Sequence, residues 1–456
     1  MQLVIIGLYL AAMLAIGFFS RKKAGETANF FVAGRKGSTL FITGSLLATA
    51  IGSSSTLGMA GLGFQRGLTG MWWLLVGAIG LLVLGIFFAG KVRRFAVYTL
   101  PELIARQYDR KVALASSILI VVSWVAIVAA QIIAAGNIMS IIASDDKTLW
   151  MVVFSAVFIL YTILGGQYSV IRTDLFQSIV IFGGLFAALG LVLSRTGGWD
   201  GLQSALPADM FSFPVSNSFE WPALVSMLLV VGLTYVVGPD MYSRIFCARD
   251  DRTARSATFW SAGLLIPIAL TVTLIGMGAA VLFPEISSQQ ALPTIIAELF
   301  SPLAGGIVLA ALLCAVMSSA DTTLLSASTI LTVDVIGYFR PNVKEATTLP
   351  LSRWIIVLLG IISLLVALQL QNIISSLLFA YTIYTCGIIL PVLAGFFREQ
   401  LKVTPAGALA ALIGGGGLGL ASKLVDVDYL DLWAIALSAV LLIGVSWVDN
   451  QLKNRI

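Results

Sequence analysis

The sequence predicts an all-α protein embedded in a lipid bilayer, and its composition and hydropathy pattern support this. Of the 456 residues, 59% are hydrophobic and only 11% are charged, and the mean hydropathy is +1.00. Apolar runs of about 18 residues or more, long enough to cross roughly 30 Å of hydrocarbon, recur along the whole chain. Such a composition is outside the range of soluble globular proteins, so lipid is the expected solvent.

About thirteen transmembrane helices are predicted, separated by short connectors. Their expected limits are 3–20, 38–61, 68–90, 112–143, 149–166, 168–194, 221–245, 258–284, 302–335, 350–369, 371–397, 403–424 and 429–449. The first run has its basic residues on the opposite side from those of a signal peptide, so we expect it to remain as a helix. No connector is long enough for a second domain, and residues 1–456 are expected to form one membrane domain.

The distribution of Lys and Arg predicts how the chain crosses the membrane. With the N-terminus outside and the C-terminus in the cytoplasm, 23 of the 27 basic residues are cytoplasmic, as the positive-inside rule requires. The four outside are Arg66, Lys147, Arg195 and Lys423. We therefore attribute the pI near 9.1 to topology and anionic lipid, and expect a multi-pass cell-membrane protein without a nucleic-acid partner.

The residue inventory argues against several kinds of chemistry. The chain has no His, and its three Cys are Cys247, Cys314 and Cys386, far apart in sequence. Disulfide frameworks, zinc sites and haem ligation are therefore poorly supported. Acid–base catalysis by histidine is excluded, and we do not expect an enzyme.

The second predicted span has the composition of a helix that breaks within the membrane. Gly52 is followed by Ser53, Ser54, Ser55 and Thr56, and further glycines flank this run. These residues are poor helix formers and offer alternative hydrogen bonds to the backbone. Transporters use broken helices to present free carbonyls to a cation and helix N-termini to an anion. The alternative interpretation is close helix packing through small residues.

The ninth predicted span carries a group of oxygen-bearing residues at helical spacing. Ala315, Ser318 and Ser319 share one face, and Asp321 and Thr322 lie one turn beyond Ser318. Hydroxyl, carbonyl and carboxylate oxygens suit a hard cation such as sodium, and two turns of them indicate two stacked positions. For the two serines alone, bonding to the preceding helical turn would be the simpler explanation.

Two further aspartates lie in or beside apolar runs, where a charge is functional by default. Asp174 falls near the start of the sixth span and Asp240 late in the seventh. The alternative for Asp174 is a structural role at a helix N-terminus, paired with Arg172. Asp240 follows a proline and could cap the helix or pair with Arg244, so we keep it only as a candidate pocket residue.

Five segments resemble the sodium/solute symporter family, which includes the sodium/glucose, sodium/proline, pantothenate and sialic acid carriers. They are 29–36 (NFFVAGRK), 99–103 (TLPEL), 165–177 (GGQYSVIRTDLFQ), 242–250 (YSR, then ARD) and 317–321 (MSSAD). They occur in family order, and the resemblance covers roughly 1–450. It implies a LeuT-type fold of two inverted five-helix halves, 38–194 and 221–397, with an extra helix and loop over 1–37 and two helices over 403–449.

The resemblance also implies two cation sites. The shared sodium site maps onto the backbone carbonyls of Ala48, Ile51 and Ala315 and the hydroxyls of Ser318 and Ser319. A second sodium position, found in only some members, maps onto Ser318, Asp321, Thr322 and Asp174. Because Asp321 stands where a serine is common, one sodium ion, two sodium ions, or sodium plus a proton all remain open.

The expected solute contacts surround the second span. They are Gly52, Ser53, Ser55, Trp72, Trp73, Gln131 and Tyr235. For the aromatic residues, helix packing or an interfacial belt is an equally good explanation. The fourth span has no Arg for an acidic sugar and the mapped pocket has no cluster for a hexose, so a small carboxylate or amino acid bound partly by helix dipoles is preferred.

These features together predict a monomeric symporter that uses sodium to bring a small organic solute into the cell by alternating access. The alternatives are a proton-coupled or sodium-plus-proton symporter of the same fold, or a solute-sensing receptor. A receptor of this type normally carries a cytoplasmic signalling domain, whereas only a few residues follow 449. A passive channel would show the same flux with and without a sodium gradient.

Overall fold

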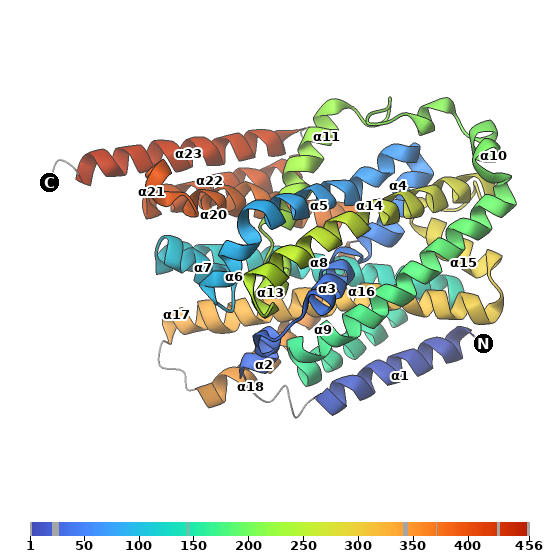
Figure 1. Cartoon of the computed structure of the whole chain (residues 1–456), viewed down its shortest axis with the longest axis horizontal. Helices are drawn as coiled ribbons and strands as arrows, with labels where there is room; N and C mark the ends of the chain where they lie inside the picture. The colour runs from blue at the N-terminus through green and yellow to red at the C-terminus, as the bar shows by residue number, and fades with distance from the viewer. Residues whose placement is uncertain are drawn as a thin grey trace.

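The computed structural model describes residues 2–20, 27–143, 146–340, 345–370, 372–425 and 429–453. Within these ranges the regular elements are helices joined by turns. Figure 1 shows the long helices lying roughly along one common axis, with α1 beginning at one end of the bundle and α23 ending at the other.

The helices differ widely in length because several are interrupted. The longer ones are α1 (Gln2–Ser20), α3 (Thr39–Ala50), α5 (Trp72–Val83), α8 (Arg110–Ala143), α9 (Lys147–Thr196), α14 (Asp251–Leu282), α16 (Pro302–Ile330), α18 (Glu345–Gln369), α19 (Ile373–Tyr384), α22 (Pro405–Leu424) and α23 (Leu430–Lys453). The shorter ones are α2 (Thr27–Val32), α4 (Met59–Arg66), α6 (Ala89–Phe95), α7 (Leu100–Gln107), α10 (Gly198–Ala205), α11 (Trp221–Met227), α12 (Leu233–Val236), α13 (Pro239–Cys247), α15 (Ala291–Leu299), α17 (Gly337–Phe339), α20 (Leu390–Gly395) and α21 (Arg398–Leu401).

Short π and 3₁₀ turns link many of these helices. The π turns are η3 (Ser54–Gly58), η5 (Leu84–Phe88), η7 (Leu228–Gly232), η9 (Leu331–Ile336) and η10 (Thr385–Ile389). The 3₁₀ turns are η2 (Ala33–Arg35), η4 (Gly67–Met71), η6 (Ala208–Phe211) and η8 (Ser288–Gln290). Such π turns are frequent at functional sites, and η3 lies in the segment where the sequence predicts a break.

The predicted spans agree with the helices. In the described part of the chain, 11 helical segments are long and apolar enough to cross a membrane, and they correspond to the predicted spans from the third to the last. The first predicted span is α1, and the second comprises α3, η3 and α4. The residue boundaries of the two five-helix halves remain a prediction.

The second predicted span is interrupted, which confirms the expected break. α3 ends at Ala50, and at Ile51 the backbone leaves the helical region with φ −100° and ψ 68°. Side chains then satisfy the carbonyls that the break frees. The Ser55 hydroxyl donates to the carbonyl of Ala50 at 2.5 Å, and the Thr56 hydroxyl donates to that of Gly52 at 2.8 Å. The serine and threonine run thus stabilises a break that the glycine permits.

The seventh predicted span is also broken, and this second break is absent from the predictions. α12 ends at Val236, Val237 leaves the helical region with φ −133° and ψ 78°, Gly238 is extended, and α13 begins with Pro239. The Tyr384 hydroxyl donates to the freed carbonyl of Val237. A Gly-Pro pair is a recognised signal for a helix boundary, so the information was present in the sequence.

A reversal at Gly166 separates the fifth and sixth predicted spans within α9. Gly166 has φ 52° and ψ −161°, a conformation that is strongly disfavoured for residues with a side chain. A Cβ atom there would also lie 2.5 Å from the ring of Phe30. Glycine is therefore required at this position for both reasons.

The polar residues of the membrane region are concentrated on buried helices. α16 is buried over nearly its whole length and packs against α8, α9, α18, α1 and α3. By contrast, α18 and α23 expose large apolar side chains such as Trp354, Trp433 and Trp447. Because lipid cannot satisfy hydroxyls and carboxylates, this arrangement places the chemistry of α16 in the protein interior.

Candidate functional site

The break in the second span faces the hydroxyl-rich turn of α16. The Ser318 hydroxyl lies 3.3 Å from the carbonyl oxygen of Ala48 and 3.4 Å from that of Ala315. The Ser319 hydroxyl lies 3.4 Å from the carbonyl oxygens of both Ala48 and Thr49. Four of the five residues expected at the shared sodium site are therefore in one cluster. The fifth, Ile51, is buried and is the residue at which the helix breaks.

These oxygens are available because of local backbone structure. The last carbonyls of a helix have no amide partner within that helix, and those of Ala48 and Thr49 belong to the last turn of α3. The contacts with Ser318 and Ser319 are near the upper limit for O–H···O hydrogen bonds. Such weak bonds cost little to exchange for a cation, so the cluster can provide carbonyl and hydroxyl ligands to a hard ion.

The segment after the break joins this cluster to α8. A Cβ atom on Gly52 would lie 2.5 Å from the Ser319 hydroxyl and 3.2 Å from the side-chain oxygen of Gln131. The same Gln131 oxygen accepts a hydrogen bond from the Ser53 amide at 3.0 Å. The Ser53 hydroxyl is buried and has no hydrogen-bond partner among the described residues. The predicted solute contacts and the predicted cation ligands are thus next to one another.

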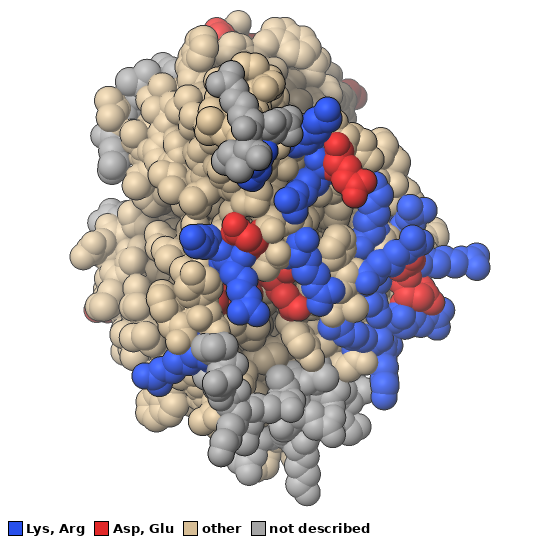
Figure 2. Space-filling view, turned by 90° about the vertical axis from the view of Figure 1, so that its left-hand side faces the viewer, with Lys and Arg blue, Asp and Glu red and all other residues tan. Residues whose placement is uncertain are grey.

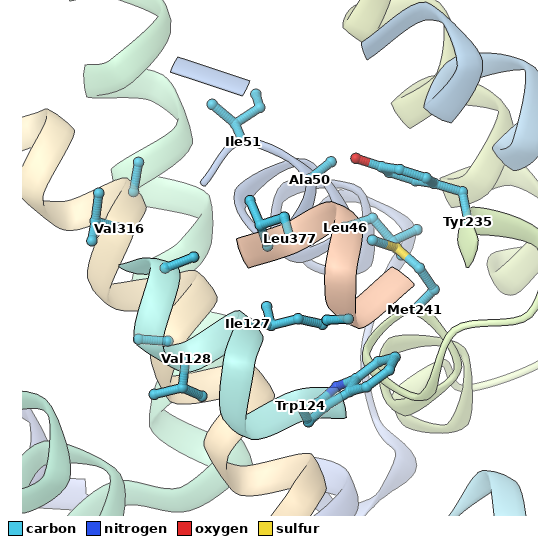
Figure 3. Packing of buried hydrophobic residues seen from close by; sticks show 14 of the residues in the cluster. Leu46, Ala50, Ile51, Trp124, Ile127, Val128, Tyr235, Met241, Val316 and Leu377 are labelled. Atoms are coloured by element: carbon cyan, nitrogen blue, oxygen red, sulfur yellow. The ribbon is translucent and has the colours of Figure 1, made fainter. Parts of the chain in front are cut away.

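A small cavity adjoins the cluster. It is lined by Thr49, Ala50, Gly52, Ser54, Trp124, Ile127, Gln131, Thr234, Tyr235, Asp240, Met241, Ser319, Thr323 and Tyr381. Its volume is about 30 Å³, which is enough for one or two water molecules. Figure 3 shows Trp124, Ile127 and Met241 grouped below the end of α3, with the Tyr235 hydroxyl directed toward Ala50. A solute larger than water requires these side chains to move.

The predicted solute contacts divide into two groups. Gly52, Gln131 and Tyr235 line the cavity, and Ser53 and Ser55 are on the adjoining segment. Trp72 and Trp73 do not line it. The Trp72 indole donates to the carbonyl of Pro214 at 2.8 Å and stacks on Phe213, so this residue anchors the connector before α11.

A second polar cluster lies one turn further along α16. The Arg244 guanidinium is 3.4 Å from the Asp174 carboxylate, and both side chains are at most 1% exposed. Arg244 also donates to the Thr322 hydroxyl, and Ser45 donates to Asp174 at 2.6 Å. Asp321 accepts a hydrogen bond of 2.8 Å from Thr162. Of the four residues expected at the second sodium position, Asp174 and Thr322 are therefore joined by a buried arginine. Thr322 also donates to the carbonyl of Ser318 at 2.7 Å, whereas Asp321 is bonded to Thr162.

This cluster corrects two expectations. Arg244 was counted among the cytoplasmic basic residues, but it is fully buried, and its ion pair in the described structure is with Asp174 rather than Asp240. Asp174 therefore has Arg244 as its partner; the Arg172 side chain lies outside the described residues. A basic residue at the edge of an apolar run can face the cytoplasm or be buried in the protein interior, and only packing distinguishes the two.

Several site residues were missed at the sequence level. The Thr49 carbonyl contacts Ser319, and Trp124, Thr323 and Tyr381 line the cavity. Asp240, kept only as a candidate, lines it as well. Nothing in the spacing of the aromatic residues distinguishes them from packing residues. Asp240 could have been identified as a site residue from the sequence, because it is a carboxylate in an apolar run that directly follows a helix-breaking Gly-Pro pair.

The helical bundle and its two broken helices beside a polar cavity define the class of secondary transporters. A family comparison identifies the family within this class: the sodium:solute symporter family matches residues 30–415. The chain belongs to this family, and it is a multi-pass membrane protein that performs sodium-coupled transport and is not an enzyme.

The chain is similar to several curated transporters. It is 25% identical over 477 residues to sodium/glucose cotransporter 4 of Danio rerio, covering 94% of this chain and 72% of the relative. It is also 25% identical over 487 residues to sodium/myo-inositol cotransporter 2 of Rattus norvegicus, covering 94% and 71%. Sodium/glucose cotransporter 1 of Sus scrofa has 25% identity over 479 residues, covering 93% and 72%.

Solved structures confirm the LeuT-type fold. A sodium-coupled sialic acid symporter in a substrate-bound outward-open state superposes with a TM-score of 0.83 and 18% identity, covering 98% of both chains. Mhp1, a nucleobase-cation-symport-1 family transporter, has a TM-score of 0.61 with 13% identity, covering 90% of this chain and 94% of Mhp1. MhsT in complex with L-phenylalanine has a TM-score of 0.55 with 15% identity, covering 91% and 98%.

Proposed function

We propose that the chain binds sodium through the carbonyls of Ala48, Ile51 and Ala315 and the hydroxyls of Ser318 and Ser319, and uses it to drive uptake of a small solute. The contacts of Ser318 and Ser319 with the end of α3 carry this proposal. Sodium ligation would hold the broken span in one geometry against α16. Because Gly52 adjoins both Ser319 and Gln131, the same geometry would organise the solute contacts, and linkage makes the effect mutual.

The solute class that we propose is a small carboxylate or an amino acid. The helix that resumes at Ser54 directs its N-terminus toward the cavity, where it favours a carboxylate. Asp240 lines the same cavity and would favour an ammonium group. The proposed contacts are Gly52, Ser53, Ser55, Gln131 and Tyr235. The similarity to glucose and myo-inositol cotransporters makes polyols the competing class.

A thermal-shift screen in detergent tests both parts of this proposal. Amino acids, small carboxylates, hexoses and inositols are each added in sodium and again in potassium. We expect stabilisation by an amino acid or carboxylate in sodium only. Stabilisation by polyols alone would overturn the solute class, whereas equal shifts in sodium and potassium would overturn the sodium site.

The transport direction and membrane orientation are also proposals. Figure 2 shows Lys and Arg side chains gathered over one end of the molecule. By the positive-inside rule this end would be cytoplasmic, with the N-terminus outside and the C-terminus inside. Alternating access would then move the solute inward in a monomer. Uptake into cells under an inward sodium gradient tests the direction, and accessibility of a cysteine introduced near each terminus tests the orientation.

Removing either serine hydroxyl should weaken sodium binding. Ser318→Ala and Ser319→Ala each delete one proposed ligand, and the loss of such an interaction costs about 1–3 kcal/mol, or roughly five- to 150-fold in affinity. Cys314→Ala is the matched control, because Cys314 is one turn earlier on α16 and interacts with Tyr9 of α1. The measurement is the sodium concentration for half-maximal uptake. An unchanged value in both serine variants would contradict the site.

We also propose that Asp321, with Ser318, Thr322 and Asp174, holds a second cation, either sodium or a proton. Asp321 accepts a hydrogen bond from Thr162, but within the described chain its carboxylate has no ion-pair partner, whereas Asp174 is paired with Arg244. A buried carboxylate without a counter-charge is costly, and a bound cation would remove that cost. A second sodium would add about 2.3 kcal/mol per 100 mV of membrane potential.

Asp321→Ala should therefore lower the charge carried per solute by about one elementary charge if the second cation is independent. The measurement is current and solute flux together in proteoliposomes, repeated at two external pH values to separate sodium from a proton. Thr162→Val is a useful companion, because it removes the hydrogen bond to Asp321 but keeps the carboxylate. The same sodium affinity and charge ratio in Asp321→Ala as in the unmodified protein would refute the second site.

A further inference from the structure

A groove on the outer surface lies where α6 meets the beginning of α14. Its volume is about 740 Å³, and its lining includes Arg94, Asp251, Arg252, Arg255, Phe259 and Trp260. α6 packs against both α13 and α14, and Figure 1 shows α6 beside α13, from which the chain continues into α14. The groove is far larger than the central cavity and contains none of the residues of the transport site.

The charge of the groove is positive. Arg94 and Asp251 form an ion pair in which Arg94 is 76% exposed. Arg252 and Arg255 have no ion pair within the described chain, so three arginines face one aspartate. Arg255 lies close to the backbone of α6, because a Cβ atom on Gly90 would be 3.1 Å from its Nε atom. The groove therefore presents guanidinium groups that are available to an anion.

The wall of the groove toward the middle of α14 is apolar and exposed. Phe259 is 42% exposed and Trp260 is 63% exposed, and the same helix continues with exposed Leu264, Ile266 and Leu270. This is the surface expected to face lipid, and tryptophan is enriched where such a surface meets the headgroup level. An occupant that uses the whole groove must combine an anionic group with a hydrocarbon chain.

We propose that this groove binds the headgroup of an anionic phospholipid, with its acyl chains along Trp260 and the exposed side of α14. Basic pockets between transmembrane helices are suited to such headgroups. A free phosphate would use only the arginines, and a soluble acidic peptide would leave the lipid-facing wall of the groove unused. The combination of charge and apolar wall favours the lipid.

The opposite side of α14 at this level contacts the helix that carries the sodium ligands. The Thr43 hydroxyl of α3 donates to the carbonyl of Ala257 at 3.5 Å, and the Ser261 hydroxyl donates to the carbonyl of Thr43 at 3.4 Å. Ala257 and Ser261 flank Phe259 and Trp260 in sequence. A lipid that holds the outer face of α14 therefore supports the packing of α3, and anionic lipid should promote transport.

The test compares the purified full chain with a variant carrying Arg94→Gln, Arg252→Gln and Arg255→Gln. Native mass spectrometry measures retention of phosphatidylglycerol against phosphatidylcholine, and sodium-dependent uptake is measured in vesicles with and without phosphatidylglycerol. We expect the unmodified chain to retain phosphatidylglycerol preferentially. In the variant, the ratio of retained phosphatidylglycerol to phosphatidylcholine should be at least about tenfold lower. Millimolar inorganic phosphate should not displace the lipid.

The control variant loses the same charge elsewhere, through Arg110→Gln, Lys111→Gln and Arg340→Gln, all exposed residues outside the groove. It should keep the lipid preference. An equal loss in the control, no lipid preference in the unmodified chain, or displacement by phosphate would each overturn the proposal. A thermal shift on adding phosphatidylglycerol to detergent-solubilised protein gives a readout that does not depend on transport.

Discussion

Replacing Arg244 with methionine should destabilise the folded protein by about 3–5 kcal/mol, the usual cost of removing one partner of a buried ion pair. The Asp174 carboxylate would remain in the interior with only the Ser45 hydroxyl as donor in the described structure. Arg244 also donates to Thr322 on α16, so the substitution disconnects three helices at once. The measurement is the free energy of unfolding in mixed micelles by denaturant titration.

Two further variants separate charge from packing. Arg244→Met combined with Asp174→Asn removes both charges, so it should recover a large part of the lost stability. Arg94→Met breaks an exposed ion pair, in which Arg94 is 76% and Asp251 is 32% exposed, and should change stability by less than about 1 kcal/mol. If Arg244→Met were as stable as Arg94→Met, the buried pair would have no structural role.

Gly52→Val should abolish sodium-driven uptake while the protein still folds. The first added carbon would lie 2.5 Å from the Ser319 hydroxyl and 3.2 Å from Gln131, and valine adds two further methyl groups. Overpacking of this kind costs about 1–3 kcal/mol, or roughly five- to 150-fold if the whole cost falls on sodium affinity. The proposed solute contacts would be displaced by the same change. Sodium titration of uptake and of thermal stability measures both effects.

Gly183→Val is the matched control for Gly52→Val. Gly183 is on α9, and a Cβ atom there would have no heavy atom within 4 Å. Its substitution should leave uptake and sodium affinity unchanged, and Gly52→Ala should have an intermediate effect. Wild-type sodium affinity in Gly52→Val would show that sodium does not bind at the proposed ligands beside this glycine.

The helical architecture was predictable because each transmembrane helix satisfies its own backbone within lipid. That requirement produces long apolar runs, which identified all the main spans from residues 3 to 449. The break near Ile51 was predictable for a related reason, since Gly52 and the following hydroxyl residues favour non-helical hydrogen bonding. The relation of Ser318 and Ser319 to Ala315 followed from helical spacing alone.

The environment of charged and aromatic residues was less predictable. Arg244 is at the end of an apolar run, where a basic residue is equally compatible with a cytoplasmic end and with a buried pair; its burial beside Asp174 places it in the interior. The residues next to Trp72 in the sequence do not distinguish it from a pocket residue. Its indole is nevertheless bonded to the carbonyl of Pro214, 142 positions along the chain. Contacts over such distances leave no periodic signal in the sequence.

The sequence by itself determined a membrane bundle, the approximate limits of its helices, and the set of oxygen-bearing residues on α3 and α16. Only the tertiary structure decided which oxygens meet, because the distance between Ala48 and Ser318 depends on how two helices separated by more than 200 residues pack together. The same packing joined Asp174 to Arg244 and formed the basic groove between α6 and α14. Helix formation depends on local backbone bonding, whereas these sites depend on contacts between distant helices.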